Sequence, residues 1–233
     1  MLLFIQKVEK EITEGALNEA TQEKTLSIIQ LIKDGGLGGQ IIIALLFVLL
    51  GVALYIYFER FFAIKSASHV DKDFMNQIRD FVVNGQLDAA KALCQNTDSP
   101  TSRLIGKGIS RIGKPLEDIN TAIENAGKLE IYKLEKNVSV VATISGAAPM
   151  IGFLGTVIGM IVAIHEIANS GGQIDIKMLS DGLYTAMTTT VAGLIVGIVA
   201  YIAYNHLVVR TDKVVYQMEA KSVEFLDLLN EPV

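Results

Sequence analysis

The sequence predicts an all-α membrane protein with three transmembrane helices and long helical extensions outside the membrane. Three segments, 35–58, 138–164 and 182–209, contain no Asp, Glu, Lys or Arg. Each of them exceeds the roughly 20 apolar residues that cross a bilayer as a helix. Hydrophobic residues make up 51% of the 233-residue chain, which is a high share for a soluble domain. A core helix of a soluble protein is usually shorter and has a polar face.

The positions of Lys and Arg predict how these helices are oriented. Eleven basic residues lie between positions 63 and 137, whereas the loop between the second and third helices contains only Lys177. Because cytoplasmic segments are enriched in Lys and Arg near helix ends, we expect the long segment and the C-terminal tail in the cytoplasm and the N-terminus outside. The predicted organisation is an N-terminal periplasmic or interfacial segment (1–39), transmembrane helix one (40–64), a cytoplasmic helical domain (65–137), helix two (138–164), a short periplasmic loop (165–181), helix three (182–207) and a cytoplasmic helical tail (208–233).

The N-terminal segment ends in TLSIIQLIKDGGLGGQ. Its Leu and Ile residues form a short amphipathic stretch that we expect to lie on the outer face of the membrane. The GGLGG cluster lacks the Gly-Lys-Ser/Thr ending of a phosphate-binding loop, so we interpret it as a hinge. Helix one, IIIALLFVLLGVALYIYF, is bulky and suited to contact with lipid. Glu59 and Arg60 follow it, and we expect them to form an interfacial anchor with a local ion pair.

The cytoplasmic segments show helical periodicity. The part that precedes helix two, KPLEDINTAIENAGKLEIYKLEKN, contains no clear helix breaker, which predicts that helix two begins deep in the cytoplasm. Helix three is likewise expected to continue into the tail. There, residues spaced three or four apart predict one packing face: Val208, Thr211, Val215, Met218, Ser222, Phe225 and Leu229.

Small residues recur every three or four positions in helices two and three. Lipid tails give no hydrophobic reward for helix contact, so small residues that let two backbones approach must promote it. We therefore expect helices two and three to pack against each other and against other copies of the chain. The residues that this prediction assigns to helix packing are Gly152, Gly155, Gly159, Gly193 and Gly197.

Hydroxyl groups are the second feature of these two helices. Helix two carries Thr156 among its glycines, and helix three carries Thr185 and Thr189 one turn apart. A helical Thr can instead donate to a carbonyl one turn earlier, and this alternative stays open for each hydroxyl. Neither helix has a carboxylate near its middle. Because a proton or ion path across a membrane normally needs an ionisable group, another chain would have to supply the acid.

Other functional classes find little support in the sequence. His165 and Glu166 begin like the zinc motif HExxH, but position 169 is Asn, so we expect no metal site. Cys94 is the only cysteine, which excludes a disulfide within the chain, and we expect it to be a small, half-buried helical residue. The net charge of −5 comes from mixed-sign segments and does not suggest nucleic-acid binding. We expect neither an enzyme nor a cofactor.

Two long motifs carry a family resemblance. APMIGFLGTVIGMIVA in helix two and DGLYTAMTTTVAGLIVGIVAYIAYN in helix three resemble the MotA/TolQ/ExbB proton-channel family, with ExbB nearest, over 36–229. The resemblance implies a bacterial inner-membrane protein in a homo-oligomeric ring, usually a pentamer, surrounded by membrane lipid. It further implies an ExbD-like single-span partner whose membrane Asp binds the proton. Proton motive force would then drive a TonB-like transducer for outer-membrane transport.

The same resemblance assigns the site. The pore threonines of the family map onto Thr156 and Thr190, and we add Thr189 and Thr185 to the predicted proton pathway. Many ExbB and TolQ chains have Glu where this chain has Thr185, and they often have Pro near Val199. Three alternatives stay open: a TolQ-like subunit of a Tol-Pal motor, a small secondary transporter with an inverted repeat, and a passive membrane scaffold.

Overall fold

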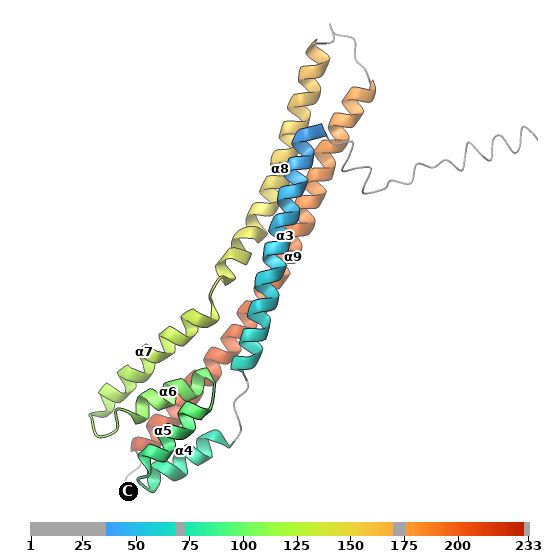
Figure 1. Ribbon diagram of the computed structural model, residues 1–233. Coiled ribbons are helices and arrows are strands. Elements are labelled where there is room, and N and C mark those ends of the chain that lie inside the picture. Colours follow the sequence, from blue (N-terminus) through green and yellow to red (C-terminus); the bar gives the residue numbers. More distant parts are fainter. Residues whose placement is uncertain (1–35, 69–72, 170–175, 231–233) are drawn as a thin grey trace, which may run out of the picture. The chain divides into compact units, whose positions relative to one another are not determined.

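The computed structural model describes residues 36–68, 73–169 and 176–230. Within these ranges the chain forms only α-helices (Figure 1). They are α3 (Gly36–Ala67), α4 (Phe74–Val83), α5 (Leu87–Asn96), α6 (Pro100–Ile109), α7 (Leu116–Leu134), α8 (Val138–Asn169) and α9 (Ile176–Asn230). Three helical stretches, Gly38–Ala67, Val138–Asn169 and Gly182–Asn230, are long and apolar enough to cross a membrane. The all-helical class with three apolar helices is therefore confirmed. The predicted amphipathic stretch before residue 36 lies outside the described residues.

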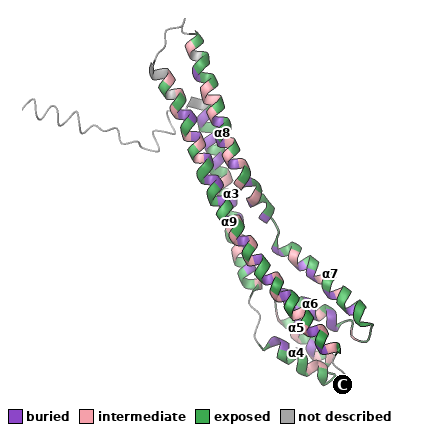
Figure 2. Ribbon diagram, turned by 180° about the vertical axis from the view of Figure 1, so that it is seen from behind, coloured by how far each residue is buried: buried purple, intermediate pink, exposed green. Residues whose placement is uncertain are grey.

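Contacts divide the chain into two compact units. Among the described residues, one unit combines 36–43 with 153–169 and 176–190, and the other combines 44–68 and 73–152 with 191–230. In the second unit, α4 packs on α5, α5 on α6, and α6 on α7. Its core takes side chains from these helices, from the end of α3 and from the C-terminal half of α9. The largest fully buried ones are Phe74, Ile64, Ile78, Ile105, Leu207, Met218 and Phe225. Figure 2 colours the buried positions of the helices purple.

The start of α6 shows how local sequence sets this fold. Ser99 is the N-cap: its hydroxyl accepts a hydrogen bond from the Ser102 amide at 3.0 Å, and the Ser99 amide donates to the Ser102 hydroxyl at 3.3 Å. Pro100 occupies the first helical position, where its missing N–H costs nothing. These reciprocal bonds satisfy amides that have no partner inside the helix. At Gly108 on the same helix, an added Cβ would lie 2.6 Å from Cε1 of Phe225 and 2.9 Å from Cδ1 of Ile123, so a larger residue there would force these buried side chains to shift.

The predicted continuous helix into the second span is wrong. Helix α7 ends at Leu134, and α8 begins at Val138. Between them Asn137 has a φ of 62°, a left-handed conformation that ends a helix and that Asn tolerates better than most residues. A single Asn therefore acts as the breaker, without the Gly or Pro that usually marks one.

Helix α9, by contrast, continues without interruption from Ile176 to Asn230, as expected. Thr211, Met218 and Phe225 of the predicted stripe are buried. Leu207 and Val214 are also buried, so the packing face is wider than the spacing alone indicated.

The glycine cluster before helix one is not a hinge within the described residues. Positions 36–39 form the first turn of α3. An added Cβ at Gly39 would lie 2.6 Å from Cγ2 of Thr185, and one at Gly38 would lie 3.5 Å from Cγ2 of Ile158. In the unit that contains residues 36–43, the glycines instead allow α3 to lie close to α8 and α9. Small residues have the same role in other membrane helices.

Candidate functional site

The predicted packing glycines lie where α8 meets α9. In the unit that contains residues 153–190, Gly155 faces Thr189: an added Cβ would lie 2.6 Å from the Thr189 Cβ. One turn further along α8, a Cβ at Gly159 would lie 3.3 Å from both the Ala186 Cβ and the Gly182 carbonyl oxygen. The two backbones therefore approach through glycine at successive turns.

The unit that contains residues 191–233 has an equivalent contact. A Cβ added at Gly193 would lie 2.6 Å from the Ala148 carbonyl oxygen and 2.8 Å from Cα of Gly152. One added at Gly197 would lie 2.6 Å from Cγ of Pro149. Each of these distances is far below ordinary van der Waals contact, so larger side chains at Gly193 and Gly197 require the helices to separate.

The hydroxyl groups of these helices bond mainly to their own backbones. Thr156 donates to the carbonyl of Phe153 at 2.5 Å, and Thr189 donates to that of Ala186 at 2.9 Å. Thr188 donates to the Tyr184 carbonyl at 2.8 Å. This is the alternative that the sequence left open. A hydroxyl that donates its proton keeps two acceptor lone pairs, so Thr156 can still accept a hydrogen bond from water or from a partner's acid.

Burial separates the four predicted pathway residues into two pairs. Thr189 is 0% exposed and Thr185 is 9% exposed, and both lie at glycine contacts. Thr156 and Thr190 are partly exposed. Of these four residues, Thr156 and Thr190 therefore have surface available to a partner in the single chain, whereas Thr185 and Thr189 contact neighbouring helices of their own chain.

No metal site is found in the part of the chain that the structure describes, where His, Cys, Asp and Glu side chains do not gather in groups of three. His165 contacts the Asn169 amide at 3.0 Å, so position 169 is a neighbour of the imidazole and not a second histidine ligand. Cys94 is buried, and burial raises the pKa of its thiol to about 11. That thiol is therefore protonated and unreactive at neutral pH.

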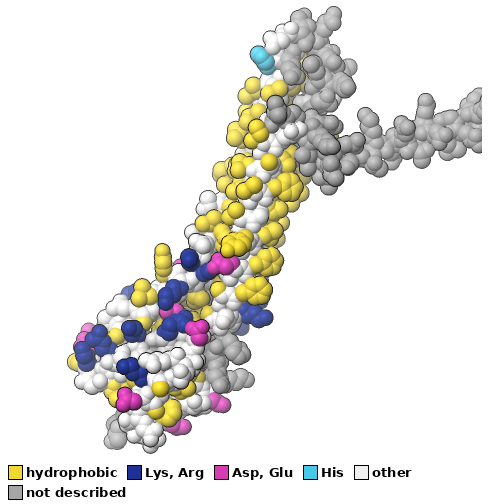
Figure 3. All heavy atoms as spheres, in the orientation of Figure 1, with side chains coloured by type: hydrophobic (Ala, Val, Ile, Leu, Met, Phe, Trp, Pro, Cys, Tyr) yellow, Lys and Arg dark blue, Asp and Glu magenta, His cyan; other side chains and the backbone are white. Residues whose placement is uncertain are grey.

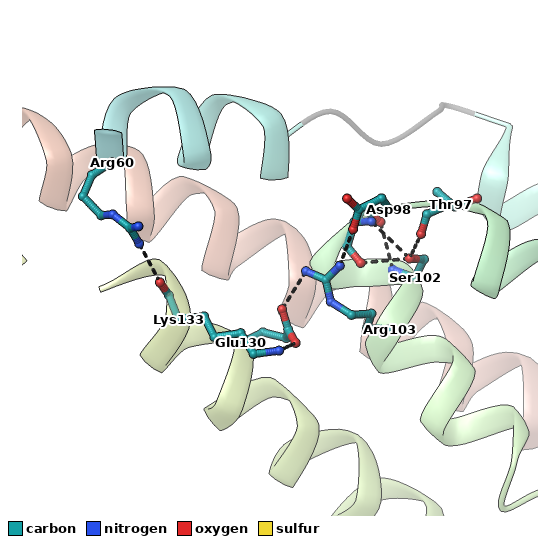
Figure 4. Close-up of polar contacts among 8 residues, drawn as sticks. Arg60, Thr97, Asp98, Ser102, Arg103, Glu130 and Lys133 are labelled. Carbon is teal, nitrogen blue, oxygen red and sulfur yellow. Dashed lines mark hydrogen bonds and ion pairs between the residues drawn. The ribbon is translucent and has the colours of Figure 1, made fainter. Parts of the chain in front are cut away.

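A polar cluster outside the charge-free segments was not foreseen from the sequence (Figure 4). Arg60 pairs with Glu59, as predicted, but it is also buried and donates to the backbone carbonyl of Lys133 at 3.0 Å. Arg103 lies between two carboxylates, with its guanidinium 2.7 Å from both Asp98 and Glu130. The cluster connects α3, α6 and α7 within one unit.

Glu130 is the buried member of this cluster. It is 5% exposed, and its other carboxylate oxygen lies 2.7 Å from the Lys133 ammonium. Burial raises the pKa of Glu130, but hydrogen bonds from Arg103 and Lys133 outweigh it, and the net pKa is below the ordinary value. Glu130 is therefore ionised and held by two cations. Sequence reasoning missed it because Arg103 and Glu130 are 27 positions apart.

The space-filling view shows that charged and hydrophobic side chains occupy different parts of the surface (Figure 3). On the face shown, acidic and basic side chains gather over the helices from α4 to α7, and hydrophobic side chains cover much of α3, α8 and α9. The exposed large hydrophobic residues of α3 include Phe47, Val48, Tyr55, Phe58 and Phe62. Such a surface is stable in lipid and not in water.

Comparison with known proteins also indicates a membrane protein. The family model described as "MotA/TolQ/ExbB proton channel family" matches residues 96–220, which is more than half of the chain. A putative biopolymer transport protein ExbB homolog from Methanothermobacter thermautotrophicus is 27% identical over 58% of this chain and 47% of its own length. The biopolymer transport protein ExbB of Helicobacter pylori is 40% identical over 34% of this chain and 54% of its own. The Tol-Pal system protein TolQ of Haemophilus influenzae is 33% identical over 40% of this chain and 40% of its own length.

These matches define the class of protein. The chain spans about half the length of the first two relatives, at 47% and 54%. Proteins of the matched family are proton-channel and transport subunits and not enzymes. Together with the three apolar helices, the family match identifies a multi-pass membrane protein, and the chain belongs to the MotA/TolQ/ExbB proton channel family.

Proposed function

We propose that this chain is the ring-forming subunit of an ExbB-like, proton-driven motor in a bacterial inner membrane. The observation that carries the proposal is the pair Thr156 and Thr190, two partly exposed hydroxyls in charge-free segments of α8 and α9. Hydroxyls can hold water and accept hydrogen bonds without bringing a charge into the membrane. They cannot bind and release a proton at neutral pH, so the acid comes from a partner.

The partner is an ExbD-like single-span subunit with a membrane Asp. It sits inside a ring of several copies of this chain, for which a pentamer is the expected number. Glycine faces on α8 and α9 and the bulky apolar surface of α3 support this arrangement, since the former permit close helix contact and the latter suits lipid. Proton flow turns one component against the other and drives a TonB-like transducer for outer-membrane transport.

A second candidate is a TolQ-like subunit of a Tol-Pal motor, which uses the same proton chemistry. The similarity to a Tol-Pal system protein at 33% identity favours keeping it. The two candidates differ in the transducer and not in the membrane site. A small secondary transporter is less well supported, because such proteins use broken helices at the membrane midplane and α8 is an unbroken helix despite Pro149.

The assembly is tested by co-expression. This chain, carrying an affinity tag, is produced together with a single-span protein that has an Asp in its membrane helix, ideally the product of the neighbouring gene. Native mass measurement in a mild detergent is expected to show several copies of this chain with the partner retained. A monodisperse single chain that never retains the partner would contradict the proposed ring.

The proton pathway is tested by removing single hydroxyls. Thr156→Val and Thr190→Val keep the side-chain shape and are expected to leave expression and assembly intact but to abolish or strongly reduce energy-dependent transport. Thr→Ser at either position is expected to retain part of the activity. Thr143→Val is the matched control, because Thr143 is exposed near the start of α8 and bonds to the Ser139 carbonyl. Normal transport by both Val variants would reject the pathway.

The proposed orientation is tested by labelling single cysteines in a Cys94→Ala background. Cysteines at positions Asn18 and Gln173 are expected to react with an impermeant reagent from outside intact inner membranes, and one at Asn120 is expected to react only after the membranes are opened. Labelling of position 120 from outside would reverse the orientation.

A further inference from the structure

An open cavity of about 960 Å³ lies among α5, α6 and α7. Its lining residues all fall between positions 91 and 133, within one compact unit and outside the charge-free segments. The charged ones are Lys91, Asp98, Arg103, Lys107, Arg111, Glu130 and Lys133. Five cations against two carboxylates leave the lining with a net charge of +3, although the whole chain carries −5. The cavity therefore favours an anion.

At one end of this cavity the charges balance (Figure 4). The guanidinium of Arg103 lies 2.7 Å from the carboxylates of both Asp98 and Glu130. The Lys133 ammonium lies 2.7 Å from the other oxygen of Glu130. Both carboxylates of the lining are thus paired with cations of the same lining, so the excess positive charge lies elsewhere in the cavity.

The excess charge comes from Lys91, Lys107 and Arg111. None of the three has an ion pair or a side-chain hydrogen bond among the described residues. Lys107 lies in the last turn of α6, and Arg111 follows in the turn after this helix. The C-terminal end of a helix attracts cations, which explains these two positions but not Lys91, in the middle of α5.

Contacts between the helices place the three unpaired cations at the same end of the cavity. The Ser102 hydroxyl of α6 donates to the Thr97 carbonyl after α5. Further along α6, a Cβ added at Gly106 would lie 3.2 Å from the Cβ of Cys94. The two helices are therefore antiparallel. Lys91 lies one turn before Cys94, which brings it level with the stretch of chain between the other two cations.

This arrangement suits one compact anion. Three unpaired cations at one level repel one another, and an anion between them removes the repulsion. A phosphate group concentrates nearly two negative charges and several acceptor oxygens at one centre, and the amides of Gln95 and Asn125 add neutral donors to the same lining. An acidic peptide would instead spread its carboxylates roughly 6–7 Å apart along one face of an extended chain, which does not match a cavity whose other end is already neutral.

The neutral end leaves room for an uncharged organic body. Besides the paired charges it is lined by Thr97, Gly106 and Leu129, which offer polar and apolar surface without further charge. Cavities of roughly 300–1,000 Å³ are the size that holds small organic molecules. The lining therefore combines a phosphate-sized cluster of cations with space for the rest of such a molecule.

A soluble ligand fits this position better than a lipid headgroup. A Cβ added at Gly108 of α6 would lie 2.9 Å from Cδ1 of Ile123, which places the unpaired cations beside the first half of α7. Ile123 precedes the charge-free run at Val138 by 15 residues, or about 22 Å of helix, and α7 leads away from the start of α8 (Figure 1). The charge of a membrane surface acts over only roughly 8 Å at physiological ionic strength.

We infer that this cavity binds a soluble organic phosphate. Lys91, Lys107 and Arg111 hold the phosphate, and the neutral end around Arg103 and Glu130 takes the uncharged part of the molecule. None of these residues belongs to the proposed proton pathway. The inference therefore goes beyond the proposed motor function, and neither fails if the other does.

The first experiment measures binding to the full chain in nanodiscs of phosphatidylcholine at physiological ionic strength. Isothermal titration calorimetry is carried out with pyrophosphate, ADP and adenosine as probes. We expect saturable binding of pyrophosphate and of ADP and none of adenosine, because the cations recognise the phosphate. Absence of binding by both phosphates, or adenosine binding as tightly as ADP, would overturn the inference.

The second experiment locates the site by removing charges. Lys107→Gln combined with Arg111→Gln is expected to raise the Kd of ADP at least about tenfold, since charge-assisted hydrogen bonds are lost. Lys91→Gln should also weaken binding, although it lies on another helix. The matched control is Lys114→Gln combined with Lys128→Gln, which removes the same charge from exposed positions outside the lining and should change the Kd less than about twofold. Equal weakening by the two pairs would show general attraction to a basic surface and reject the site.

Two further measurements identify the source of the anion. Nanodiscs of phosphatidylglycerol should leave the Kd of ADP within about twofold of its value in phosphatidylcholine, because the membrane charge is screened at this distance. Loss of ADP binding there would assign the cavity to lipid headgroups and contradict a soluble ligand. A peptide of six glutamates should bind more weakly than pyrophosphate, and tighter binding would assign the cavity to an acidic polypeptide instead.

Discussion

Adding one methyl group at Gly155 tests the close contact between α8 and α9. In Gly155→Ala the new Cβ would lie 2.6 Å from the Thr189 Cβ and 3.0 Å from its Cγ2, whereas ordinary contact begins at 3.4 Å. The Thr189 Cβ is fixed to the backbone, so no change of rotamer moves it away. Thr189 is also fully buried. The two helices must therefore move apart by several tenths of an ångström.

The size of the effect follows from comparison with Gly146→Ala. A Cβ at Gly146 on the same helix meets nothing within 4 Å. Both substitutions gain roughly 0.5–1 kcal/mol of helix propensity, so this gain cancels in the difference. Overpacking of a close contact costs about 1–3 kcal/mol. We expect Gly155→Ala to be less stable than Gly146→Ala by that amount, which corresponds to roughly 2–4 °C in Tm for each kcal/mol in a chain of this length.

The assay is thermal unfolding of the purified variants in one detergent, with a double-mutant cycle to locate the clash. Thr189→Ala removes the close contacts with the hydroxyl oxygen and Cγ2 but leaves the Cβ at 2.6 Å, so it should rescue Gly155→Ala only in part. Thr189→Gly removes the Cβ and should remove most of the penalty that Gly155→Ala shows in the wild-type background. Equal stability of Gly155→Ala and Gly146→Ala, or full rescue by Thr189→Ala, would refute the reasoning.

Two further predictions concern the helices outside the charge-free runs. Glu130→Gln should lower the free energy of unfolding by about 1–3 kcal/mol. The effect should lie towards the lower end of this range, because the side chains of Arg103 and Lys133 are 42% and 65% exposed and solvent screens their charges. The control Glu124→Gln, on the same helix, should change the free energy of unfolding little. The pKa of Glu130 is below its ordinary value of 4.5 in the folded protein, so its contribution is present above pH 4.5 and is lost as pH falls through the lower folded pKa. The difference in melting temperature between wild type and Glu130→Gln should therefore shrink as the pH is lowered below 4.5, and a constant gap would contradict this. Asn137→Ala should destabilise by about 1–2 kcal/mol because alanine disfavours a φ of 62°, while Asn137→Gly should not; equal melting temperatures for the two would show that the left-handed turn is not required.

The family and the residue types of the candidate site could be predicted from the sequence, but the exposure and burial of its threonines could not. The motifs around Thr156 and Thr190 indicated the family and the residue types. Which threonine is exposed and which is buried depends on how α8 and α9 are rotated against each other, and spacing along one helix does not determine that rotation. Thr189 shares a face with Gly193 in the sequence pattern, but its burial results from Gly155 on the other helix.

The membrane-spanning helices were determined by the sequence alone. A run of more than 20 residues without charge must satisfy its backbone hydrogen bonds internally in lipid, and a helix does this without help from any other part of the chain. The continuous α9 follows in the same way, since its buried positions repeat at helical spacing.

Only the tertiary structure decided the contacts between distant residues. The bond from Arg60 to the Lys133 carbonyl and the pairing of Arg103 with Glu130 join positions 73 and 27 residues apart. No local pattern marks such pairs, because their energy depends on distance in space and on burial. The turn at Asn137 was missed for a related reason: Asn prefers a left-handed φ only weakly, and the surrounding packing, not the residue alone, selects it. Among the described residues, the buried hydroxyl of Thr211 has no hydrogen-bond partner. The sequence could not indicate this, because it depends on where every neighbouring side chain lies.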